Sequence, residues 1–106
     1  MKIEDLLSVA HTYGSPVYVY DADKISSQYQ RLTAAFSSVP HLRINYAMKA
    51  LSNISVLKLM KKLGAGLDTV SIQEVQLGLR AGFAPQQIIF TPNGVSLDEI
   101  EEAMRL

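Results

Sequence analysis

Hydrophobic and polar residues follow a helical rhythm in the first third of the chain. Near the N-terminus, apolar side chains recur at helical spacing before Gly14 and Pro16, which predicts a short amphipathic helix that ends there. A β-branched and aromatic run at 17–20 predicts a strand, and Asp21 is suited to cap the helix that follows. That second helix is predicted from one apolar stripe, formed by Ile25, Tyr29, Leu32 and Phe36.

From Leu42 onward, strand-like and helix-like runs alternate three times at a spacing of roughly 22 residues. The predicted strands are 43–49, 66–71 and 88–93, and the predicted helices are 53–63, 72–81 and a segment from 97 onward. The second and third of these helices open with serine followed three positions later by glutamate, which is the capping-box pattern. Short loops between strands and helices predict an α/β fold with a parallel sheet, either an open doubly wound sheet or a (β/α)8 barrel.

Three βα units alone would leave sheet edges unpaired and one apolar sheet face uncovered. The last predicted helix also has a start signal but no stop signal before Leu106. A complete (β/α)8 barrel takes about 250 residues. We therefore expect the chain to be the front portion of a longer protein.

Charge and composition narrow the classes of function. Ten basic and ten acidic side chains leave no net charge at neutral pH, so nucleic acids and anionic membranes are not expected as partners. The chain has no cysteine, and His11 and His41 lack a second ligand at metal spacing, so no metal site is predicted. Acidic residues interrupt the first apolar run, so we expect neither a signal peptide nor a membrane span, and a cytoplasmic location.

Lys49 is the main candidate for chemistry, because it stands at the C-terminal end of the predicted strand 43–49. Strand alternation places Tyr46 and Met48 toward the helices and Lys49 on the opposite face, which points inward in a barrel. A neutral amine in a sheltered pocket is what Schiff-base chemistry with an aldehyde cofactor requires. On position alone, a lysine that extends into solvent and carries no function fits equally well.

Two acidic residues follow Lys49 along the predicted sheet. If Leu67 faces the helices, Asp68 faces the interior, and neighbouring strands would bring its carboxylate and Lys49 into one cavity. Without that lysine, a surface aspartate at a strand start explains Asp68 as well. Glu74 is already explained by the capping box with Ser71, which also places it at the carboxyl ends of the strands, the catalytic rim of a barrel.

Four motifs follow one another along the chain from residue 16 onward. They are PVYVYD at 16–21, YAMKA at 46–50 with Asn53, GAGLDTVS at 64–71 with Glu74, and AGF at 81–83 followed by FTPNG at 90–94. Taken in order, they resemble the N-terminal part of diaminopimelate decarboxylases, and the resemblance covers nearly the whole chain from Gly14. These enzymes belong to the fold-type III, alanine-racemase-like group of pyridoxal-phosphate enzymes, which also holds ornithine, arginine and carboxynorspermidine decarboxylases.

The resemblance implies a domain organisation and a set of site residues. Residues 22–106 would form part of a pyridoxal-phosphate-binding TIM barrel, and residues 1–21 would supply a helix and a strand to a C-terminal β-domain. Lys49 would form the Schiff base with pyridoxal 5′-phosphate, while Asp68 and Glu74 would lie near the cofactor.

The resemblance also implies an activity. The full-length protein would be a homodimer that decarboxylates an amino acid. The reaction that the resemblance favours is the conversion of meso-diaminopimelate to L-lysine and CO2. The phosphate site, the acidic partner of the pyridine nitrogen and the residues shared across the dimer interface would lie beyond Leu106. The 106-residue chain alone is therefore expected to be inactive.

Other functions remain open from the sequence. Within the same class, a polyamine-pathway decarboxylase or an amino-acid racemase would carry the same lysine motif. A non-catalytic barrel that stores or delivers pyridoxal phosphate would keep Lys49 without the decarboxylation machinery. A structural or interaction piece would have a Lys49 that never reacts with the aldehyde.

Overall fold

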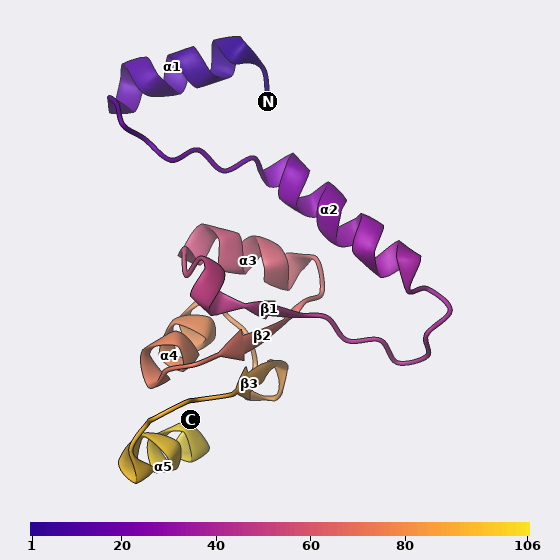
Figure 1. Cartoon of the computed structure of the whole chain (residues 1–106), viewed down its shortest axis with the longest axis vertical. Coiled ribbons are helices and arrows are strands. Elements are labelled where there is room, and N and C mark those ends of the chain that lie inside the picture. The colour runs from indigo at the N-terminus through magenta and orange to yellow at the C-terminus, as the bar shows by residue number, and fades with distance from the viewer.

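Three parallel strands and five α-helices make up the computed structural model, which describes residues 1–106 (Figure 1). Two short 3-10 turns, η1 and η2, complete the chain. The predicted alternation of strands and helices after residue 42 is confirmed. The elements in order are α1 (Ile3–Tyr13), α2 (Ala22–Ala35), β1 (Asn45–Ala47), η1 (Met48–Ala50), α3 (Ile54–Lys62), β2 (Gly66–Thr69), α4 (Ile72–Arg80), η2 (Pro85–Gln87), β3 (Ile88–Phe90) and α5 (Leu97–Arg105).

The sheet has the order β1-β2-β3, and both strand pairs are parallel, as predicted. Ala47, Asp68 and Ile89 are register partners across the three strands. The strands are shorter than predicted, most of all β1, because the backbone turns into η1 directly after Ala47. A hydrogen bond of 3.0 Å from the Leu51 amide to the Met48 carbonyl closes that turn.

Side-chain caps begin the helices where the sequence predicts them. The Asp21 carboxylate accepts a hydrogen bond from the Lys24 amide at 2.9 Å at the start of α2. This bond, together with one from the Met1 ammonium, holds the pKa of Asp21 below its usual range. The capping box predicted at the start of α5, between Ser96 and Glu99, is formed in full.

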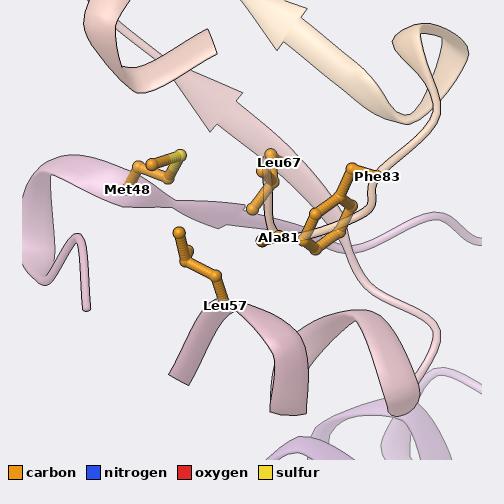
Figure 2. Close-up of a cluster of buried hydrophobic side chains, with 5 residues drawn as sticks. All are labelled: Met48, Leu57, Leu67, Ala81 and Phe83. Atoms are coloured by element: carbon orange, nitrogen blue, oxygen red, sulfur yellow. The ribbon is translucent and has the colours of Figure 1, made fainter. Parts of the chain in front are cut away.

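One face of the sheet carries the core, and α3 and α4 cover it (Figure 1). Figure 2 shows the side chains of Leu67 from β2, Leu57 from α3 and Phe83 directed toward one another in one cluster. Burial of such side chains is the main stabilising contribution in a domain of this size. The cluster consists of Met48, Leu57, Leu67, Ala81 and Phe83.

The helix α2 packs against α3 through only half of its predicted stripe. Ile25 and Tyr29 lie against a second cluster, formed by Val56, Met60 and Ala65. The other two stripe residues, Leu32 and Phe36, are 45% and 47% exposed.

The opposite face of the sheet carries the row Ala47, Asp68 and Ile89, and we call it the open face. Side chains alternate between the faces of a strand, so this row points away from the buried Leu67. Ile89 is exposed, while Ala47 and Asp68 are partly exposed. The helices of the chain therefore leave this face available.

The predicted strand at 17–20 does not form. These residues are exposed and take no regular structure, and they follow α1, which lies apart from the sheet (Figure 1). A strand needs a neighbouring strand to pair its backbone N–H and C=O groups, and none of the three strands pairs with this segment. The assignment of residues 1–21 to a separate β-domain stays a prediction. None of the helices combines the length and the hydropathy that crossing a bilayer requires.

Candidate functional site

The candidate site lies where the three strands end. Parallel strands bring their carboxyl ends to one edge of the sheet, so the segments that follow β1, β2 and β3 are neighbours there. We call this the carboxyl edge. Lys49 follows β1, Asp68 and Glu74 flank the end of β2, and Thr91 follows β3.

Lys49 is exposed at the carboxyl edge, but it is not part of a strand. It lies on η1, so the prediction that Lys49 is part of the strand is wrong, and strand alternation does not set the direction of its side chain. That the side chain faces the interior of a barrel stays a prediction. The chain itself provides no burial for the amine. Its Nζ makes no hydrogen bond and no ion pair with the rest of the chain, which leaves it available to a ligand.

The residues beside Lys49 hold its backbone in place. Met48 is fully buried in the core cluster, as its predicted position toward the helices requires. The Tyr46 hydroxyl donates a hydrogen bond of 3.0 Å to the carbonyl of Leu51, which spans η1. Burial raises the pKa of Tyr46, and the nearby Tyr20 raises it further, so this hydroxyl keeps its proton. Lys49 is thus an exposed, unbonded side chain on a fixed turn.

Asp68 lies on the open face of β2, opposite the buried Leu67, as alternation predicts. Its register partner on β1 is Ala47, two residues before Lys49, and η1 lies in contact with β2. The Oδ1 atom accepts a hydrogen bond of 2.6 Å from the hydroxyl of Thr91. The structure therefore brings the Asp68 carboxylate to the edge that carries Lys49.

Glu74 has a structural task at the start of α4. Its Oε2 accepts a hydrogen bond of 2.8 Å from the amide of Val70, while its own amide donates to the Ser71 hydroxyl at 3.2 Å. The carboxylate thus binds the amide one residue before the predicted capping partner, and it also stands favourably at the positive end of the helix dipole. These contacts explain a glutamate at this position, and its place near a cofactor stays a prediction.

Thr91 was missed by reasoning from the sequence. Its amide donates to the carbonyl of Thr69 at 2.8 Å, which extends the pairing of β2 and β3 by one step. Phe90 faces the helix-covered side, so alternation directs Thr91 to the side of Asp68. This alternation along the strand is the signal by which Thr91 could have been found from the sequence.

The carboxyl edge can engage a carbonyl compound through an amine and a nearby carboxylate. A primary amine condenses with an aldehyde to form a C=N bond, and a fixed backbone with a reachable nitrogen suits this reaction. The free amine of Lys49 and the carboxylate of Asp68 thus fit the chemistry of an aldehyde cofactor such as pyridoxal 5′-phosphate.

Comparison with known proteins supports this chemistry. The family model of the pyridoxal-dependent decarboxylases, pyridoxal-binding domain, matches residues 22–106. Diaminopimelate decarboxylase of Helicobacter pylori strain J99 is 46% identical over 95 residues, which are 90% of this chain and 23% of that protein. The enzyme of the same name from Methanothermobacter thermautotrophicus is 39% identical over 101 residues, or 94% of this chain and 24% of that protein.

Solved structures agree with the sequence matches. Diaminopimelate decarboxylase of Helicobacter pylori, complexed with L-lysine, has a TM-score of 0.85 at 40% identity over 98% of this chain and 25% of that chain. Lysine/ornithine decarboxylase of Vibrio vulnificus, complexed with cadaverine, has a TM-score of 0.88 at 26% identity over 97% and 27%. The chain spans about a quarter of the length of these proteins, and its three parallel strands match the N-terminal part of their barrel domain.

Proposed function

Because the chain belongs to the pyridoxal-dependent decarboxylases, as part of their pyridoxal-binding domain, we propose that Lys49 is the residue that binds pyridoxal 5′-phosphate covalently. The observation that carries this proposal is the exposed, unbonded amine of Lys49 at the carboxyl edge, on a turn fixed by Met48 and Tyr46. The other lysines near the core lie on α3, away from the carboxyl ends of the strands.

Each residue of the carboxyl edge has a definable task in this proposal. Lys49 would hold the cofactor through a C=N bond between its Nζ and the aldehyde carbon, with the aldehyde oxygen lost as water. The Asp68 carboxylate, at the same edge of the sheet, would favour a protonated nitrogen at the attachment point. When bound, the cofactor supplies an electron sink for the electron pair left behind by the departing CO2.

We propose that the full-length protein decarboxylates meso-diaminopimelate to L-lysine. The support is the identity to diaminopimelate decarboxylases, which reaches 46% over most of the chain. The structural likeness to a lysine/ornithine decarboxylase keeps a smaller diamino acid as the second candidate substrate.

The uncovered parts of the chain support a larger barrel around this site. The open face carries Asp68 and the exposed Ile89, and the segment 17–20 presents unpaired backbone with a Tyr18 side chain that is 89% exposed. We propose that further strands and helices cover the open face as in a (β/α)8 barrel, and that 17–20 joins a β-domain. Closure of the barrel would shelter Lys49 from water.

The substrate is tested by CO2 release from the full-length protein in the presence of pyridoxal 5′-phosphate. The substrates are meso-diaminopimelate, L-ornithine, L-lysine and L-arginine at matched concentrations. We expect kcat/KM for meso-diaminopimelate to exceed that for the others by at least about 100-fold. The reason is that the other three substrates lack the distal amino acid group, so the polar groups of the site that bind it would be left without hydrogen-bond partners. Preference for L-ornithine would move the protein to the polyamine branch, and CO2 release from none of the four would contradict the proposed activity.

A further inference from the structure

We propose that Thr91 is a positioning residue, which holds the Asp68 carboxylate in the orientation that Lys49 requires for binding the cofactor. This inference rests on the proposed function of Lys49. Thr91 follows β3, whereas Lys49 follows β1 and Asp68 lies in β2. The Thr91 side chain contacts the site through one short hydrogen bond, to Asp68.

The hydrogen bonds around Thr91 define the direction of its hydroxyl proton. The Thr91 Oγ1 lies 2.6 Å from Asp68 Oδ1 and 3.4 Å from the carbonyl oxygen of Thr69. A hydroxyl has one proton to donate, and the shorter contact to a carboxylate has the length of a charge-assisted bond. The proton of Thr91 therefore points at Asp68.

The backbone of Thr91 is fixed independently of its side chain. Its amide donates to the Thr69 carbonyl at 2.8 Å, and Phe90, the residue before it, is paired with Thr69 in the sheet. The hydroxyl of Thr69 itself donates to the carbonyl of Ile89 on the buried side, at 2.9 Å, and is not available to Asp68. Thr91 is thus the side chain of this chain that binds the Asp68 carboxylate.

The consequence is a carboxylate with one oxygen held and one oxygen left for a ligand. Asp68 Oδ1 is engaged by Thr91, while Oδ2 accepts no hydrogen bond from the chain. A carboxylate fixed in this way needs no reorientation when a positive charge forms at the Lys49 nitrogen, and such preorganisation lowers the cost of binding. Loss of the Thr91 hydroxyl should therefore weaken cofactor capture without disturbing the fold.

The test uses the full-length protein and measures the initial rate at which Lys49 is captured by pyridoxal 5′-phosphate. The adduct is trapped with borohydride and measured by peptide mass mapping, so the readout does not depend on turnover. Thr91→Val removes the hydroxyl at nearly constant volume, and Thr91→Ser keeps it. Thr12→Val is the matched control, because the Thr12 hydroxyl also donates one hydrogen bond, to the carbonyl of Ser8 at 2.8 Å, but lies on α1.

We expect capture by Thr91→Val to be slower by about tenfold, as for loss of one hydrogen bond to a charged group, with Thr91→Ser within about twofold of the parent. Thr12→Val should react at the parent rate. In an Asp68→Asn background, Thr91→Val should have no further effect, because the two residues act as one unit. Thr91 belongs to neither hydrophobic cluster, so the melting temperature should not change, and Thr91→Ala should repeat the result of Thr91→Val.

Two outcomes would overturn this inference and leave the proposed function of Lys49 intact. One is a parent-like capture rate in both Thr91→Val and Thr91→Ala. The other is that Thr91→Val slows capture as much in the Asp68→Asn protein as it does in the parent protein. If the parent protein itself forms no adduct at Lys49, the proposed function fails, and the inference fails with it.

Discussion

Lys49→Ala in the full-length protein is expected to lower kcat/KM for decarboxylation by a factor on the order of 10⁴ or more, because the covalent attachment of the cofactor is lost. Lys49 lies at the carboxyl edge with its amine free of hydrogen bonds and ion pairs, and no other lysine of the chain shares that position. The measurement is steady-state CO2 release with pyridoxal 5′-phosphate in excess.

Two variants test whether activity is lost because the primary amine is missing, and not because of lost charge or of any lysine replacement in the chain. Lys49→Arg keeps the positive charge but cannot form the C=N bond, so it should be as inactive as Lys49→Ala. Lys58→Ala removes an exposed lysine of α3 and should leave turnover unchanged. Retained turnover in Lys49→Ala, or near-normal turnover in Lys49→Arg, would contradict the assignment.

Leu67→Ala is expected to destabilise the full-length protein by about 3 kcal/mol, because it leaves a cavity in the middle of the core. Leu67 is fully buried at the centre of the sheet, and its side chain reaches Gly78 of α4, where a Cβ would clash with it. The substitution therefore loosens the contact between β2 and α4. Urea unfolding followed by far-UV circular dichroism measures the change in the free energy of unfolding.

The matched control is the same substitution at an exposed site. Leu97 at the start of α5 is 71% exposed, so Leu97→Ala should change the free energy of unfolding by less than about 0.5 kcal/mol. If the two leucine variants unfold at the same urea concentration, the described core is wrong.

Local signals predicted most of the fold. The serine caps at Ser71 and Ser96 start their helices where the sequence places them, because capping depends on residues only three positions apart. Alternation correctly placed Leu67 and Asp68 on opposite faces of β2, because both lie inside a strand.

The differences arise where structure depends on partners distant in the sequence. A buried Met48 fits both a continued strand and the turn η1, so hydrophobicity could not show that β1 ends at Ala47. The run at 17–20 has strong strand propensity, but propensity does not supply a pairing partner.

In the candidate site too, local signals could be predicted from the sequence and contacts between distant segments could not. Lys49 and Asp68 could be predicted as candidates because an amine and a carboxylate near the carboxyl ends of neighbouring strands suggest chemistry by themselves. Thr91 could not, because a threonine after a strand is ordinary until the register of β2 and β3 brings its hydroxyl to Asp68. The bond from Tyr46 to Leu51 likewise depends on the turn geometry of η1.

The measurement that tests the central claim most directly is borohydride reduction of the full-length protein after incubation with pyridoxal 5′-phosphate, followed by peptide mass mapping. Reduction converts the C=N bond into a stable secondary amine, so the modified lysine can be identified without knowledge of the substrate. We predict a pyridoxyl adduct on Lys49 and on no other lysine of the chain. An unmodified Lys49 in folded protein, or an adduct on a lysine of α3 instead, would contradict the claim.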